Sequence, residues 1–99
     1  MRYNTLAEFY PFYLSQHVDP TCRRLHVIGT TGVIALVIVA IVTANLWLLL
    51  ALPVVGYGFA WVGHFFFERN KPATFEYPLY SLLCDFLMWR DVLLRRIPW

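Results

Sequence analysis

The chain has 99 residues, of which 60% are apolar and 18% are aromatic, and its formal net charge is +2. This length fits one small domain, but the apolar residues are too contiguous for the core of a water-soluble protein, so the composition indicates an integral membrane protein. The low net charge, without an exposed basic run, excludes a nucleic-acid-binding protein.

Residues 5–17 are predicted to form a short helix at the membrane interface. Thr5 and Glu8 have the spacing of a capping box, which marks the start of a helix. Four aromatic side chains follow, at a density typical of the headgroup level: Phe9, Tyr10, Phe12 and Tyr13. The segment is too short to cross a bilayer, so we expect it to lie on the membrane and to end near His17.

The centre of the chain is an uncharged apolar run over residues 27–63, and a histidine closes each end, His26 and His64. The main polar break surrounds Asn45, which lies 19 residues from each histidine. If the chain turns there, each helical arm is about 28 Å long, close to the hydrocarbon thickness of a bilayer. The run therefore predicts an antiparallel hairpin that returns both histidines to one membrane face.

The two arms predict transmembrane helices over residues 20–44 and 46–70. On the second helix, Gly56, Ala60 and His64 follow one another at four-residue spacing. Small residues at that spacing mark the side on which membrane helices pack closely. We therefore expect His64 to face the first helix rather than lipid.

A last helix is predicted over residues 77–95. Asp85 lies at its centre and three arginines follow, so it should lie along the interface rather than cross the membrane. Its apolar face contains Leu79, Leu82, Leu83, Phe86, Leu93 and Leu94. The predicted fold is thus all-α, a single membrane domain over residues 1–99 in which interfacial amphipathic helices flank a two-helix transmembrane hairpin.

The positions of the basic residues predict the orientation in the membrane. Seven of them lie outside the hairpin on its open side, whereas the turn at Asn45 carries no charge: Arg23, Arg24, Arg69, Lys71, Arg90, Arg95 and Arg96. By the positive-inside rule, both termini and the histidines are cytoplasmic. Cys22 and Cys84 would then be reduced. We expect a bacterial inner membrane protein.

Three histidines on one side of the membrane form a candidate metal site. A single histidine there is more often a polar anchor. Here, however, His64 and Glu68 are four residues apart on one face of a helix, and His26 should face them from the other helix. His17 can fold over the same place. Imidazoles with a carboxylate suit iron, zinc or copper better than calcium or magnesium. The spacing does not choose among these metals.

Arg23 and Arg24 have two equally supported interpretations. They can serve only as determinants of topology, or one of them can hold an anionic headgroup while an acyl chain lies in the membrane beside the hairpin. Cys22 precedes His26 by one turn, but a buried cysteine usually behaves as a small hydrophobic residue, so we leave it out of the ligand set. The sequence does not decide the partner of Asp85.

Two stretches together resemble a known family. The first is HVDPTCRRLHVIGT, residues 17–30, and the second is GHFFFERNKPATFEYPLYSLLCDFLMW, residues 63–89. They are similar to the small membrane family of the yeast 2-hydroxy fatty acid dioxygenase of phytosphingosine breakdown, formerly a domain of unknown function. Position 22 departs from the pattern, because it is cysteine where many relatives carry asparagine.

The resemblance implies an iron(II)-dependent dioxygenase that uses molecular oxygen to shorten a long-chain 2-hydroxy fatty acid by one carbon. The histidines of the family correspond to His17, His26 and His64, and its glutamate corresponds to Glu68, as a ligand or as a hydrogen-bond acceptor beside the ligands. Arg23 or Arg24 would neutralise the carboxylate of the substrate.

Two other classes of protein remain open at this stage. Histidines on facing helices can also be the axial ligands of a haem in an electron-transfer protein. The chain can also be a non-catalytic membrane module, whose histidines are anchors and whose small residues serve a homo-oligomer.

Overall fold

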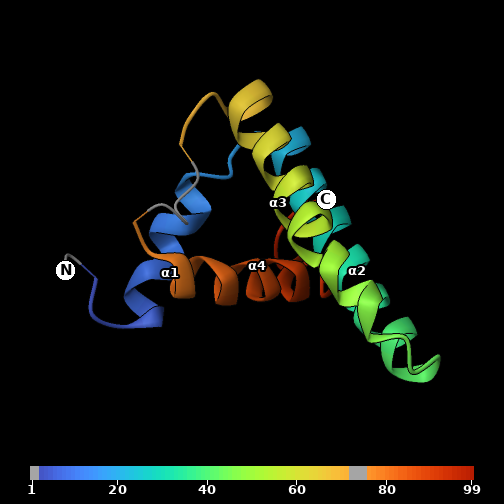
Figure 1. Cartoon of the computed structure of the whole chain (residues 1–99). Coiled ribbons are helices and arrows are strands. Elements are labelled where there is room, and N and C mark those ends of the chain that lie inside the picture. The colour runs from blue at the N-terminus through green and yellow to red at the C-terminus, as the bar shows by residue number, and fades with distance from the viewer. Residues whose placement is uncertain (1–2, 72–75) are drawn as a thin grey trace.

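The computed structural model describes residues 3–71 and 76–99, and this part of the chain is entirely helical (Figure 1). The described residues form four α-helices: α1 (Leu6–Ser15), α2 (Pro20–Val42), α3 (Leu52–Val62) and α4 (Pro78–Leu93). A 3-10 segment, η1 (Leu46–Ala51), leads into α3, and a π-helical segment, η2 (Gly63–Glu68), follows it. The prediction of an all-helical chain is confirmed for these residues.

The local sequence explains where the first two helices begin. The Thr5 side chain accepts a hydrogen bond from the Glu8 backbone N–H at 3.1 Å, and the Glu8 carboxylate accepts one from the Asn4 N–H at 3.3 Å. At the start of α2, the Asp19 carboxylate accepts from the Cys22 N–H at 3.0 Å, and a proline occupies the first helical position. Both helices therefore start where side chains satisfy their free N–H groups.

Both long helical segments end two residues before the predicted positions. Helix α2 ends at Val42, shortly before Ala44, whose φ is 53°. The continuous segment of η1, α3 and η2 ends at Glu68, because Arg69 adopts a φ of 59°. A left-handed residue cannot continue a right-handed helix. Pro72, which we expected to stop this segment, lies outside the described residues, as does Ala73 of the second motif.

Helices α2 and α3 run antiparallel and in close contact (Figure 1). A Cβ atom added to Gly29 would lie 3.0 Å from the Cβ of Phe59, and one added to Gly32 would lie 2.9 Å from a methyl group of Val55. Glycines on α2 therefore let the backbones approach each other. The sequence pattern predicts small residues on the second helix, with Gly29 and Thr30 of the first helix as the matching surface. Gly29 lies at the contact as predicted, whereas a Cβ atom added to Gly56 of the second helix would lie 3.4 Å from a methyl group of Val33.

Helix α4 crosses the α2–α3 pair and also packs against α1 (Figure 1). The buried core of the protein lies at these contacts and is rich in aromatic and sulfur-containing side chains: Phe9, Tyr13, Val27, Tyr77, Cys84, Met88 and Val92. The Trp89 indole N–H also donates to the Thr31 hydroxyl at 2.9 Å, which links α4 to α2. This arrangement holds the linker between α1 and α2 over the ends of the two long helices.

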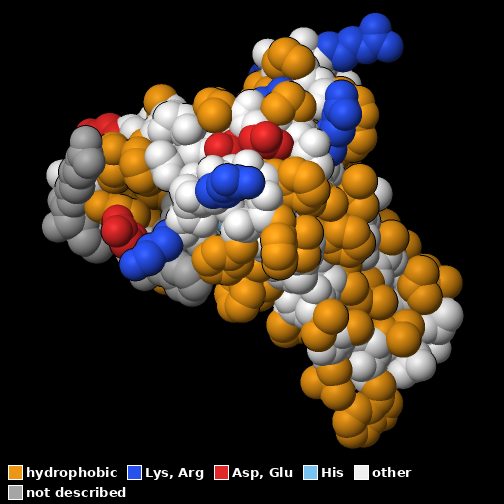
Figure 2. Space-filling view, turned by 90° about the horizontal axis from the view of Figure 1, so that it is seen from above, with side chains coloured by type: hydrophobic (Ala, Val, Ile, Leu, Met, Phe, Trp, Pro, Cys, Tyr) orange, Lys and Arg blue, Asp and Glu red, His pale blue; other side chains and the backbone are white. Residues whose placement is uncertain are grey.

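Two helical segments are long and apolar enough to cross a membrane, Pro20–Val42 and Leu46–Glu68, each of 23 residues. Only 28% and 11% of their most apolar windows are buried within the chain, whereas the core helix of a soluble protein would be mostly buried. Figure 2 shows hydrophobic side chains covering the turn end of the α2–α3 pair, while charged side chains gather over the rest of the visible face.

Candidate metal centre

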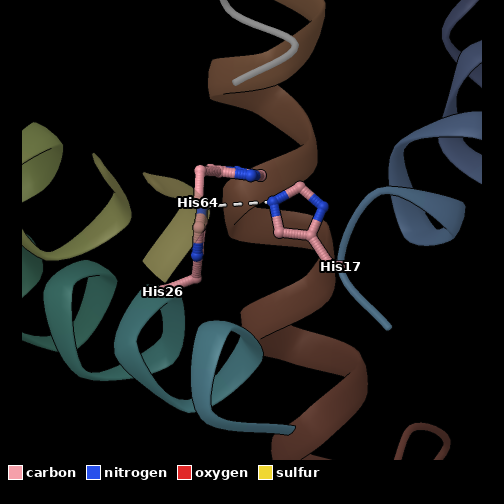
Figure 3. A group of neighbouring side chains, drawn as sticks. All are labelled: His17, His26 and His64. Carbon is pink, nitrogen blue, oxygen red and sulfur yellow. Dashed lines mark hydrogen bonds between the residues drawn. The ribbon is translucent and has the colours of Figure 1, made fainter. Parts of the chain in front are cut away.

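The three predicted histidines meet in one place (Figure 3). His17 lies in the linker between α1 and α2, His26 lies on α2, and His64 lies on η2. Their exposed fractions are 2%, 5% and 2%, and their ring centroids are 4.4 to 4.7 Å apart. One nitrogen from each ring lies within 4.8 Å of the other two. This group, called the histidine cluster below, could hold a metal ion.

Backbone carbonyl groups orient two of the rings. The Nδ1 atom of His17 lies 2.6 Å from the carbonyl oxygen of Tyr13, and the Nδ1 atom of His26 lies 2.9 Å from that of Cys22. A carbonyl oxygen can only accept a hydrogen bond, so each Nδ1 must carry the hydrogen. In the neutral form of both rings, Nε2 therefore carries no hydrogen and has a free lone pair.

A side-chain amide orients the third ring in the same way. The Nδ1 atom of His64 lies 2.6 Å from Oδ1 of Asn70. The amide cannot be reversed without loss, because its NH₂ group donates to both the backbone oxygen and the side-chain oxygen of Gln16, each at 3.2 Å. Asn70 thus presents oxygen to His64, and the Nε2 atom of His64 is also left as an acceptor or a ligand.

The lone pairs inside the cluster explain why a cation fits there. The Nε2 atoms of His17 and His26 are 3.1 Å apart, the contact drawn as a dashed line in Figure 3, yet neither neutral ring has a hydrogen to place between them. Burial and the neighbouring imidazoles hold the pKa of His17 well below its usual value, so this ring stays neutral near pH 7. A metal ion bound by the Nε2 atoms would remove the repulsion, and imidazole nitrogen suits iron, zinc or copper.

The π-helical segment η2 brings His64 and Asn70 together. Its widened turn lets the backbone N–H groups of Arg69 and Asn70 both reach the His64 carbonyl, the latter at 3.1 Å. The absent side chain of Gly63 lets the start of α2 approach, since a Cβ there would lie 3.0 Å from the sulfur of Cys22. The sequence predicted a regular helix here and gave no role to Asn70, although Asn70 stands in the second motif.

Glu68 lies beside the histidine cluster but does not belong to it. Its carboxylate accepts a hydrogen bond from the backbone N–H of Asp19, two residues after His17. This contact ties the end of η2 to the linker that carries His17. In the structure Glu68 therefore holds two histidine-bearing segments together, and its role as a metal ligand stays a prediction.

The two arginines make different contacts near the C-terminus. Arg23 donates from Nε to the carbonyl of Pro98 at 2.9 Å and from Nη1 to the carbonyl of His17 at 3.2 Å, so it borders the cluster. Arg24 is exposed, donates to the carbonyl of Trp99 at 3.0 Å and lies over the Trp99 ring at 5.7 Å. Of the two, Arg23 is the closer to the histidines.

Tyr13 and Asp85 extend the site toward α4. The Tyr13 ring stacks on the imidazole of His17 with centroids 4.1 Å apart, and its hydroxyl donates to the Asp85 carboxylate. Burial raises the pKa of Asp85 to about 7, although the hydrogen bond from Tyr13 acts in the opposite direction. The partner of Asp85, which the sequence left undecided, is therefore a tyrosine of α1.

The pKa of Asp85 predicts a pH-dependent stability. Between about pH 4 and pH 7 the folded protein keeps a proton that the unfolded chain releases, so the free energy of unfolding falls as the pH rises through this range. Asp85→Asn does not ionise and still offers Tyr13 an oxygen. At pH 8 it should be more stable than the wild type by up to roughly 4 kcal/mol, and the gain should vanish near pH 4.

Thermal unfolding of the metal-free protein in detergent, followed by circular dichroism at both pH values, measures this difference. Equal melting temperatures of the two proteins at pH 8 would contradict the prediction.

Fold and site together define a small all-helical protein with two potential membrane-spanning helices and a buried histidine cluster suited to a metal ion. The chain belongs to the family described as 2-hydroxy-palmitic acid dioxygenase Mpo1-like, whose model matches residues 3–97. The family resemblance of the two sequence motifs is thereby confirmed. The search of curated proteins and the search of solved structures each gave no match.

Proposed function

We propose that the protein is a membrane-embedded, iron(II)-dependent dioxygenase that shortens long-chain 2-hydroxy fatty acids by one carbon. The observation that carries the proposal is the histidine cluster, in which three buried imidazoles lie together and each Nδ1 faces an oxygen acceptor, which leaves each Nε2 without a hydrogen. It occurs in a member of a family described by 2-hydroxy-palmitic acid dioxygenase activity. Three protein ligands leave coordination positions open, as catalytic metal sites require.

The proposed reaction balances with oxygen as the oxidant. The bond between C1 and C2 of the 2-hydroxy acid breaks, C1 leaves as carbon dioxide, and C2 becomes the carboxyl carbon of the shorter acid. One molecule of oxygen is consumed for each acid, and one molecule of water is formed. Bound iron(II) would supply the one-electron chemistry with oxygen that organic side chains lack.

The residues of the chain have separate tasks in this proposal. His17, His26 and His64 hold the metal, and the acceptors on their Nδ1 atoms fix the tautomer and orientation of each ring. Arg23, at the border of the cluster, would neutralise the substrate carboxylate. Burial of the histidines keeps bulk water away from the reacting carbon.

The two long helical segments would place this chemistry in a membrane. Segments Pro20–Val42 and Leu46–Glu68 have mean hydropathies of 2.5 and 1.8 and expose most of their apolar side chains. Inserted as a hairpin, they would put the histidine cluster at the cytoplasmic interface, beside the basic residues. The polar end of a fatty acid could then enter the site while its chain stays in an apolar environment.

The geometry favours a single metal ion over a haem. Axial histidines of a haem must stand on opposite sides of the porphyrin ring. Here the Nε2 atoms of His17 and His26 are 3.1 Å apart and His64 closes the same space, which leaves no room for a porphyrin.

Metal analysis of the purified protein, followed by anaerobic reconstitution with iron(II) and oxygen-electrode measurements, tests the proposal. With 2-hydroxypalmitate we expect oxygen and substrate to disappear in a one-to-one ratio, with pentadecanoate as the product. Palmitate, which lacks the 2-hydroxyl group, is the matched control and should support no uptake. Failure to bind metal, together with no oxygen uptake after reconstitution, would refute the proposed function, and a Soret band would indicate a haem protein instead.

A further inference from the structure

A cavity of about 230 Å³ lies between α2, α3 and α4. One polar end is formed by His26 and Asp85, and the other residues that line it are mainly apolar, among them Val33, Pro53 and Phe86. On α2 the lining extends from His26 to Val33, two helical turns or about 10 Å along the axis. The cavity thus begins at the histidine cluster and leads along the helix pair toward the turn.

Small residues of α3 create the space. Gly56 and Ala60 line the cavity one turn apart, opposite Thr30 and Val33 of α2. The sequence predicts a face for close helix packing at Gly56, Ala60 and His64, but the closest contacts of the pair are made by Gly29 and Gly32 of α2. Gly56 and Ala60 instead leave room beside the histidine cluster.

The shape and chemistry of the cavity fit one kind of ligand, a polar head on an alkyl chain. Its polar end is continuous with the histidine cluster through His26, and Asp85 is joined to the same cluster through Tyr13, which stacks on His17. The volume is below the roughly 300 Å³ of sites that enclose a drug-sized ligand, so only the first part of a long chain would fit inside. The remainder would extend along the exposed apolar surface of the helix pair.

We propose that this cavity binds the acyl chain of a long-chain fatty acid next to its carboxyl end, and that Gly56 and Ala60 set the width of the chain it accepts. The inference rests on the proposed function, because it places the reacting end of the substrate at the histidine cluster. The ligand is a free fatty acid, although the tail of a membrane phospholipid offers the same alkyl chemistry.

A photolabelling experiment on the full chain in phosphatidylcholine nanodiscs tests the inference without metal. The probe is 2-hydroxypalmitate with a diazirine on its alkyl chain, and labelled residues are mapped by mass spectrometry. Label should concentrate on the cavity-lining residues of α2 and α3. Gly56→Leu should reduce it about tenfold, the factor expected when about two methylene groups lose an apolar site.

Gly58→Leu is the matched control, because it makes the same change two residues away on the same helix. A Cβ atom at Gly58 would meet nothing within 4 Å, and this residue does not line the cavity, so labelling should equal that of the wild type. Ala60→Val fills the cavity from the next turn and replaces Gly56→Leu if that variant does not fold. Label spread evenly over the outer apolar surface, unchanged by either cavity variant, would overturn the inference.

Two further arms separate the remaining outcomes. Competition by unlabelled palmitate but not by lysophosphatidylcholine supports a free fatty acid, whereas the reverse assigns the cavity to a phospholipid tail and overturns the inference. Labelling as expected with no oxygen uptake by the iron-loaded protein would refute the proposed function while the fatty-acid site stands. Oxygen uptake by the iron-loaded protein, together with labelling that is the same in Gly56→Leu as in the wild type, would refute the cavity inference alone.

Discussion

Replacing His64 by alanine should lower metal affinity by more than about 100-fold and abolish the oxygen uptake. The change removes one of three imidazoles whose ring nitrogens lie within 4.8 Å of one another. Loss of a metal ligand should cost more than the 10- to 100-fold loss of affinity that is typical when a group hydrogen-bonded to a ligand is removed. His17→Ala and His26→Ala should have the same effect. Metal content after equilibrium dialysis, and oxygen uptake with 2-hydroxypalmitate, measure the two losses.

Cys22→Ala is the matched control for these variants. Cys22 is fully buried one turn before His26, so its replacement disturbs the packing nearby but leaves all three imidazoles in place. Its backbone carbonyl, which orients His26, also remains. Near-stoichiometric metal in Cys22→Ala and almost none in the three histidine variants would match the proposed ligand set. Full metal content in all three histidine variants would instead favour a non-catalytic module with anchoring histidines.

The coarse fold follows from the sequence because the thickness of a bilayer sets the length of a helix that crosses it. The apolar run of residues 27–63 has its main polar break around Asn45, and the equal distances from Asn45 to His26 and His64 predict that both histidines return to the same end. The structure brings these two rings to within 4.7 Å between centroids. The length of the apolar run alone therefore predicts that these two members of the cluster lie together.

The finer parts of the site depend on contacts that cannot be predicted from the spacing of apolar residues in the sequence. The π-helical segment η2 begins where Gly63 approaches Cys22, a contact between segments far apart in the sequence, and it ends before the left-handed Arg69. A regular helix over the same residues was the natural prediction from apolar pattern alone. As a result, Asn70 was recognised as part of a motif but not as the partner of His64.

The partner of Asp85 was also out of reach of the sequence. A carboxylate in the middle of an amphipathic helix is normally assigned to solvent or to a nearby arginine. In the structure it accepts from Tyr13, 72 residues earlier in the chain, because α4 packs across α1. The same packing forms one wall of the cavity, so the position of α4 links the histidine cluster to the space proposed for the acyl chain.

Asn70→Ala should weaken metal binding by about 10- to 100-fold while the protein remains folded. The variant keeps all three imidazoles but removes the Asn70 oxygen, which lies 2.6 Å from Nδ1 of His64. Without it, the ring loses the hydrogen bond that fixes its tautomer and its orientation, the usual role of a group behind a metal ligand. Metal titration by competition with a chelator measures the change in affinity.

Asn70→Asp separates the orientation of His64 from general packing, because it keeps the oxygen acceptor and loses only the donor to Gln16. It should recover most of the lost affinity, and the ligand-field spectrum of the cobalt(II)-substituted protein should return toward that of the wild type. A purely structural role of Asn70 would give the Asn70→Asp and Asn70→Ala variants the same spectrum.

Asn45→Ala is the matched control, because it makes the same substitution at the exposed turn, far from the cluster and without contact to a histidine. It should bind metal as the wild type does. If Asn70→Ala matched Asn45→Ala in metal affinity, the orienting role of Asn70 would be wrong.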